Sequence, residues 1–146
     1  MKYIANFKRV EKKYLVTPEQ YLRFLPRMEE HMGADQYGEC TVCNLYLDTA
    51  DDLLVRRSIE KPKYKEKMRL RSYGVPSDGD TVYLEIKKKA WGVVYKRRVG
   101  LSAARAMAYL AGEAPLPTDG QIEREIDYMR RRYALYPKLY LAYDRV

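Results

Sequence analysis

A row of cations between Lys63 and Tyr73 is the part of this sequence that could do chemistry. In a β-strand, successive side chains point to opposite faces, so every second residue shares a face. Every second position here is basic: Lys63, Lys65, Lys67, Arg69 and Arg71. Like charges side by side on a strand repel unless an anion lies between them, and arginine forks and lysine ammonium groups bind phosphate well. The row predicts a site for a phosphate-rich ligand; a solvated edge strand whose lysines prevent aggregation is the alternative.

Two later segments repeat this pattern. Residues 81–89 place Glu85 and Lys87 on one strand face, and residues 93–99 place Lys96 and Arg98 together. Several such strands curled into a barrel would make a channel lined with Lys and Arg, with a few carboxylates available for a divalent metal. An ordinary cross-strand salt bridge is the alternative role for Glu85 with Lys87.

Composition favours a single globular domain over residues 1–146 with an anionic partner. The chain has 28 Lys and Arg against 20 Asp and Glu, a formal charge of +8, which favours polyphosphate, nucleotides, nucleic acid or an anionic membrane surface. No run of 18 apolar residues exists and the N-terminus lacks an apolar signal core, so we expect a cytoplasmic protein without a membrane span. With one His in the chain, Cys40 and Cys43 are better explained as inert thiols than as a metal or redox pair.

The order of elements predicts an α+β fold with an antiparallel sheet, because consecutive strands are joined by turns. Thr17, Pro18 and Gln20 form a helix start, and Pro26 predicts a kink or short break in that helix. Asp48 or Thr49 should cap a short helix, and Thr118 or Asp119 a late one. Strands are expected at 7–16, 39–48, 63–73, 81–89, 93–99 and 139–146, and helices at 18–32, 50–59, 103–111 and 120–135.

Several motifs, taken in order, resemble the VTC domain, the polyphosphate polymerase branch of the triphosphate tunnel metalloenzymes. Glu11-Lys12-Lys13-Tyr14 resembles its opening strand, and Tyr46-Leu47-Asp48-Thr49 its second strand. The stretch from Lys67 to Tyr73, then Glu85-Ile86-Lys87, Lys96-Arg97-Arg98, and Pro137 with Tyr143-Asp144-Arg145 look like its later tunnel strands. Each motif is weak alone, whereas the ordered set spans nearly the whole chain.

The resemblance implies a tunnel of antiparallel strands with flanking helices, in which the γ-phosphate of ATP is transferred to a polyphosphate chain. It implies Mn²⁺ or Mg²⁺ as cofactor, with Glu11 and Glu85 as metal-binding residues. The phosphate-binding residues that it implies are Lys13, Lys67, Arg69, Arg71, Lys87, Lys96, Arg98, Tyr143 and Arg145.

Two departures from the family pattern shape the expectation. Arg9 replaces the first acid of the ExExK opening of related tunnel enzymes, and the family continues beyond the YxR strand, whereas this chain ends at Val146. We therefore expect a domain without the family's C-terminal strands, forming a partial barrel, with pairing of two chains through exposed strand edges as a further possibility.

Three functions fit these residues. The first is polyphosphate synthesis from ATP, the second is a tunnel-fold triphosphatase, and the third is a non-catalytic binder of polyanions. ATP and polyphosphate are the expected ligands, and no specific nucleic acid is expected. Product analysis separates the two enzymes, while a binder would show no turnover and no dependence on Mn²⁺.

Overall fold

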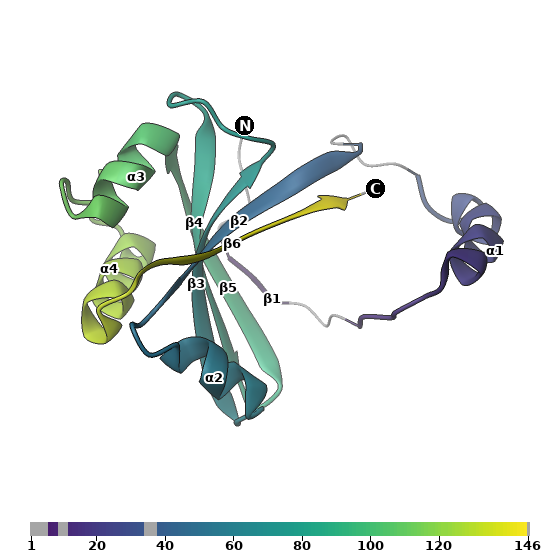
Figure 1. The fold of residues 1–146 in the computed structure, drawn as a ribbon, viewed down its shortest axis with the longest axis horizontal. Helices are drawn as coiled ribbons and strands as arrows, with labels where there is room; N and C mark the ends of the chain where they lie inside the picture. Colours follow the sequence, from purple (N-terminus) through teal and green to yellow (C-terminus); the bar gives the residue numbers. More distant parts are fainter. Residues whose placement is uncertain (1–5, 9–11, 34–37, 146) are drawn as a thin grey trace.

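The protein is a six-stranded antiparallel sheet with helices attached, as the computed structural model of residues 6–8, 12–33 and 38–145 shows (Figure 1). The strands are β1 (Asn6–Lys8), β2 (Cys40–Asp48), β3 (Tyr64–Tyr73), β4 (Thr81–Ala90), β5 (Val93–Ser102) and β6 (Tyr136–Arg145). The helices are α1 (Pro18–Glu29), α2 (Leu53–Ile59), α3 (Ala103–Ala111) and α4 (Gln121–Tyr133). The predicted α+β class with an antiparallel sheet is confirmed.

The strands lie in the order β1-β5-β4-β3-β2-β6, and every neighbouring pair is antiparallel. Within the described residues, β1 and β6 are the two edges and do not pair with each other, so the sheet is not closed. Figure 1 shows that β2 and β6 run at a marked angle to β3, β4 and β5, so the sheet is strongly twisted toward the β6 edge.

The main hydrophobic cluster lies on one face of the sheet. Met68, Leu84 and Ile86 point to this face and are at most 1% exposed. They pack with Ile126 and Met129 of α4, and α3 and α4 both lie on this side of the strands (Figure 1). Burying these alternating apolar residues leaves the other residues of the same strands on the opposite face.

Helix α2 begins as the sequence predicts, through side chains that precede it. Asp48 accepts hydrogen bonds from the backbone amides of Leu54 (2.9 Å) and Val55 (3.0 Å), and Thr49 Oγ1 accepts from Leu53 (2.9 Å). The residue at the formal N-cap position is Asp52, with a φ of 61° and no side-chain cap bond. Asp48 therefore joins β2 to α2 by satisfying amides that a helix start leaves free.

The N-terminal region corrects the prediction of a strand at 7–16. Of its described residues, only those up to Lys8 are in a strand, residues 12–17 have no regular structure, and 9–11 lie outside the described residues. The capping box from Thr17 to Gln20 is confirmed. Helix α1 continues through Pro26 without a break and ends at Glu29, and none of its side chains is buried. In Figure 1 this helix stands apart from the sheet.

Two smaller corrections concern ends of elements. Strand β3 begins at Tyr64, so Lys63 precedes it, and the row on the strand contains four cations instead of five. The N-cap of α4 is Gly120, without a side-chain cap bond, although Thr118 or Asp119 was the expected cap. Strand β6 begins earlier than predicted, because it pairs with β2 from Tyr136 onward.

Candidate functional site

The face of the sheet opposite the core carries the predicted cations together. Residues that stand directly opposite in neighbouring strands share a face. Lys67, Lys87 and Lys96 form one such row across β3, β4 and β5, and Arg69, Glu85 and Arg98 form the next. We call this surface the basic face; its charged residues in β3–β5 are Lys65, Lys67, Arg69, Arg71, Glu85, Lys87, Lys89, Lys96 and Arg98.

A single carboxylate lies among eight cations on the basic face of these three strands. Glu85 is 1% exposed. Arg69 donates from Nε to Glu85 Oε2 at 2.8 Å, and its Nη2 lies 2.8 Å from the same oxygen. Lys96 Nζ is 3.0 Å from Oε1, and Arg71 Nε is 3.8 Å from Oε2. We call these four residues the Glu85 cluster.

The charges of the Glu85 cluster explain its protonation. Burial on its own would raise the pKa of Glu85, but the positive charges of Arg69, Lys96 and Arg71 together outweigh burial and hold that pKa below its ordinary value. Burial lowers the pKa of Lys96 below its ordinary value, with Glu85 opposing the shift and the two arginines adding to it. Glu85 is thus ionised at neutral pH, and it remains far outnumbered by cations.

Polar neighbours on β2 orient the two arginines. Arg69 donates from Nη1 to the Tyr46 hydroxyl at 3.0 Å, and Arg71 donates from Nε to Asn44 Oδ1 at 3.0 Å. Asn44 is 1% exposed and donates in turn to the backbone carbonyl of Leu141 on β6 at 3.2 Å. Hydrogen bonds to the protein therefore fix the positions of both guanidinium groups. Little side-chain entropy would be lost if they bound a ligand, because they are already ordered.

Sequence reasoning did not assign Asn44 and Tyr46 to the site. It named residues 39–48 as an expected strand, and Tyr46 only as part of the motif that resembles the second strand of the family. Their alternate spacing on a strand was the available signal, since both occupy the face that becomes continuous with Arg69 and Arg71 once β2 pairs with β3.

The remaining expected phosphate-binding residues fall into three groups: four on the basic face, two on β6, and Lys13 outside the sheet. Lys67, Lys87, Lys96 and Arg98 all lie on the basic face with the two arginines. Arg98 also stacks over the ring of Tyr83, 4.5 Å from its centroid.

Tyr143 and Arg145 occupy β6 opposite Val42 and Cys40, which places them on the same side of the sheet as the basic face. Arg71 is in register with Asn44, four residues along β2 from Cys40. Arg145 therefore lies about 13 Å along the strand direction from the row of Arg71. The described sheet does not bring it to the Glu85 cluster.

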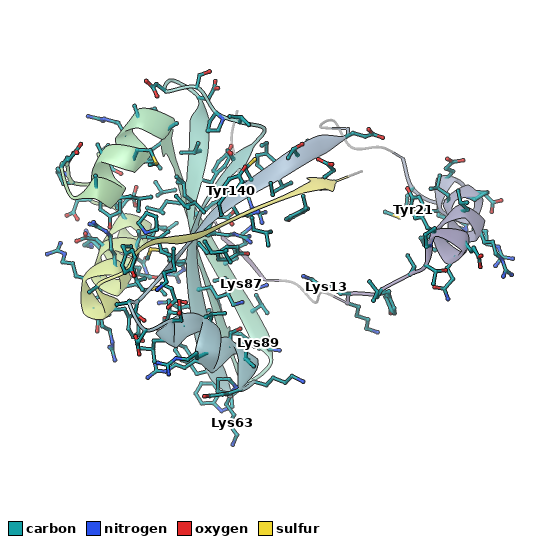
Figure 2. The ribbon with its side chains drawn as sticks, viewed as in Figure 1. Lys13, Tyr21, Lys63, Lys87, Lys89 and Tyr140 are labelled. Carbon is teal, nitrogen blue, oxygen red and sulfur yellow. The ribbon has the colours of Figure 1, made fainter. Side chains whose placement is uncertain are left out.

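Lys13 is not in the sheet. It lies on the segment that connects β1 with α1, exposed and outside any strand (Figure 2). Lys13 therefore does not belong to the described sheet, and its role in phosphate binding stays a prediction. Glu11 lies outside the described residues.

The described residues do not fit a divalent metal. No group of three or more His, Cys, Asp or Glu side chains close enough to hold one occurs among them. Both oxygens of Glu85 are within 3.0 Å of a cation, and hard divalent cations require several free oxygen ligands. Glu85 in this arrangement neutralises basic side chains, and it is not placed to bind Mg²⁺ or Mn²⁺.

The fold is that of the tunnel-fold class of domains, and the basic face lies on the concave sheet of this fold. A crystal structure of a candidate adenylate cyclase from Bacillus halodurans has the same fold: its TM-score is 0.63 at 18% identity, over 97% of this chain and 67% of the other. The model of the VTC domain matches residues 8–146. The chain belongs to the VTC domain family, and the resemblance found in its motifs is confirmed. No match was found among curated proteins, and none of the described helices is long and apolar enough to cross a membrane.

Proposed function

We propose that the basic face binds a chain of phosphates and that the protein is a polyphosphate polymerase, which transfers the γ-phosphate of ATP to polyphosphate. The Glu85 cluster carries this proposal. Three cations contact its buried carboxylate, and the basic face of β3–β5 carries eight cations in all, a local excess of seven positive charges (8 − 1). An excess of this size on a half-buried face favours a polyanion over any single carboxylate ligand.

The proposed reaction needs no nucleophile from the protein. A terminal phosphate oxygen of the polyphosphate attacks the γ-phosphorus, a new P–O bond forms, and the bond from the γ-phosphorus to the β–γ bridging oxygen breaks so that ADP leaves. The protein's task is to align the two chains and to offset the charge on the transferred group. Arg69 and Arg71 suit this task because their positions are fixed by Glu85, Tyr46 and Asn44 before a ligand arrives.

A non-catalytic polyanion-binding module is the second candidate. The engagement of Glu85 by cations, together with the absence of a metal-binding group among residues 6–8, 12–33 and 38–145, favours it. This candidate predicts binding of tripolyphosphate that does not depend on Mn²⁺, and no conversion of ATP. A triphosphatase using the same face would release only small phosphates, whereas the polymerase makes long chains.

Calorimetric titration with tripolyphosphate at low and high salt tests the site. We expect one-to-one binding that survives high salt and weakens at least about tenfold in Arg69→Ala and Arg71→Ala, because each removes a charge-assisted contact. Arg131→Ala is the control, since Arg131 is an exposed residue of α4. Weak binding at many sites that salt abolishes in all variants would contradict a built site.

Incubation with ATP, polyphosphate and Mn²⁺, followed by separation of products by length, then tests the reaction. Growth of long chains supports the polymerase, release of orthophosphate or pyrophosphate supports the triphosphatase, and tight binding without products supports the binding module. A cytoplasmic location stays a prediction.

Pairing of two chains through β6 is a further proposal. This edge strand exposes Leu139, Tyr140, Leu141 and Tyr143 by 43–60%. Unpaired backbone groups beside apolar side chains invite a second strand. Light scattering after size exclusion would show a dimer, and introducing a charge with Leu141→Lys should reduce it.

A further inference from the structure

A pocket of about 500 Å³ opens beside the Glu85 cluster, between α2, β2 and β6. Its volume lies within the range of small-ligand sites. We call it the α2 pocket; its lining residues that matter here are Tyr46, Val55, Lys67, Lys138, Leu139 and Leu141. Most of its wall is apolar, from Leu47 and Leu54 at the core to Leu139 and Leu141 on β6.

The α2 pocket and the basic face share a wall. Tyr46 lines the pocket, and its hydroxyl accepts a hydrogen bond from Arg69 (3.0 Å), which belongs to the Glu85 cluster. Lys67 also lines the pocket and stands in the cation row with Lys87 and Lys96. Lys67 is half-buried, and among the described residues its ammonium group makes no ion pair or hydrogen bond. A half-buried cation without a partner, at the border of an apolar cavity, is suited to an anionic group of a ligand.

Most polar groups around the α2 pocket already have hydrogen-bond or ion-pair partners within the protein. The Asp48 oxygens accept backbone amides, at 2.9 Å from Leu54 and 3.0 Å from Val55. Lys138 donates to the carbonyl of Ala50 at 2.9 Å and lies 3.2 Å from Asp52 Oδ1. The pocket therefore offers shape and apolar surface, with few free donors or acceptors that could distinguish one base from another.

We infer that the α2 pocket binds the nucleoside part of a nucleoside triphosphate, with Lys67 at its first phosphate and little preference among bases. This inference rests on the proposed function, because the phosphates must lie on the basic face for the nucleoside to reach the pocket. The aromatic ring of Tyr46 and the side chains of Val55 and Leu139 give a flat base an apolar environment. Discrimination by an apolar pocket is small, whereas strong discrimination requires hydrogen bonds that the pocket does not supply.

Filling the pocket tests the inference. Val55→Trp places a large ring in the pocket from a side chain that is 43% exposed, and Ile59→Trp, from a side chain on the same helix that is 72% exposed and not among the pocket's lining residues, is the control. Calorimetric titration would use ATP, GTP, UTP and tripolyphosphate. We expect Val55→Trp to weaken the binding of all three nucleotides at least about tenfold, because the nucleoside would lose its contacts in the pocket. Tripolyphosphate binding should stay unchanged in both variants, and in the native protein the three nucleotides should agree within about tenfold.

Each other outcome has a definite meaning. If the native protein binds neither tripolyphosphate nor ATP, the proposed function and this inference both fail. If tripolyphosphate binds but Val55→Trp leaves the nucleotides unaffected, the nucleoside lies elsewhere and only this inference fails. A preference for one base by about a hundredfold or more would overturn the claim of weak discrimination.

A measurement on the native protein guards against a misfolded variant. Photolabelling with 8-azido-ATP should modify peptides that contain residues 46–55 or 138–141, and excess tripolyphosphate should prevent it. Labelling confined to other peptides would overturn the inference whatever the variant does.

Discussion

Replacing Glu85 by Gln should destabilise the fold through the cations that it leaves behind. The substitution keeps the shape of the side chain but removes the charge that lies within 3.0 Å of Arg69 and Lys96 and 3.8 Å from Arg71. Removing one partner of a buried ion pair costs about 3–5 kcal/mol. The cationic side chains are 12–19% exposed, so water screens part of their repulsion, and we expect about 3 kcal/mol.

Chemical denaturation gives the free energy of unfolding directly, and thermal melting should show a fall of about 10 °C in Tm. Glu66→Gln is the matched control on the neighbouring strand. Glu66 accepts hydrogen bonds from Tyr64 (2.8 Å) and Tyr133 (2.6 Å), so its neutral replacement should cost about 1 kcal/mol. Equal losses in the two variants, or no loss in Glu85→Gln, would refute the view that one carboxylate holds the basic face together.

The pH dependence of that loss supplies an independent check. The folded-state pKa of Glu85 lies below its ordinary value of 4.5. A carboxylate with a lowered pKa contributes stability that is fully present above the unfolded-state pKa and is lost as the pH falls through the folded-state pKa. The difference in stability between the native protein and Glu85→Gln should therefore be constant near neutral pH and shrink below 4.5. A difference that grows on acidification would contradict the assignment.

Two further perturbations follow from the same contacts. Burial holds the pKa of Lys96 below its ordinary 10.5, so tripolyphosphate affinity, measured by calorimetry, should fall as the pH is raised toward that value. Lys96→Arg should reduce this fall and delay it to higher pH, because arginine keeps its charge. An unchanged profile in the variant would show that Lys96 does not contact the ligand. Asp48→Ala leaves the first backbone amides of α2 without acceptors, so it should lower the free energy of unfolding by about 2 kcal/mol. Asp52→Ala is the control and should cost well under 1 kcal/mol, because the ion pair of Asp52 with Lys138 is partly exposed. Similar losses in these two variants would show that Asp48 does not hold the helix.

The sequence was most informative where alternation and turns agreed. Residues 63–73, 81–89 and 93–99 alternate between apolar and charged positions, and short turns separate them. The three strands that form there turn the predicted charged positions to one face, with Met68, Leu84 and Ile86 on the other. The start of α2 was predictable for the same reason, since capping is a local interaction between neighbouring residues.

The strand predicted at 7–16 fails because a strand needs a partner of matching length. Lys8 pairs with Tyr95, and β5 begins only two residues earlier in sequence, at Val93. Residues 12–16 would therefore run past the end of β5 and leave their backbone groups unpaired. Alternation of residue types indicates which side chains could share a face, but the reach of the neighbouring strand decides where the ladder stops.

The role of Glu85 could not be derived from its own strand. Its partners are Arg69 and Arg71 of β3 and Lys96 of β5, and they reach it because the strand register sets Glu85 opposite Arg69 and Arg98. A shift of one residue in the β3–β4 register would have set Glu85 opposite Met68 or Leu70, whose side chains face the core. The spacing of the motif within β4 therefore identified Glu85, but which side chains contact it could be known only from the register of the neighbouring strands.

If the basic face binds polyanions, as proposed above, that arrangement explains why a carboxylate belongs in it. Eight cations on three adjacent strands would repel one another in the absence of ligand, and one buried carboxylate orders the two arginines and Lys96 at the centre. One carboxylate neutralises only a small part of the positive charge on the basic face, so a phosphate chain bound there would still be strongly attracted by the remaining cations. A divalent metal at Glu85 would have to displace Arg69 and Lys96 and would add positive charge to an already cationic face. In the described part of the chain, direct contact between arginine and phosphate is therefore the more favourable way to hold the ligand.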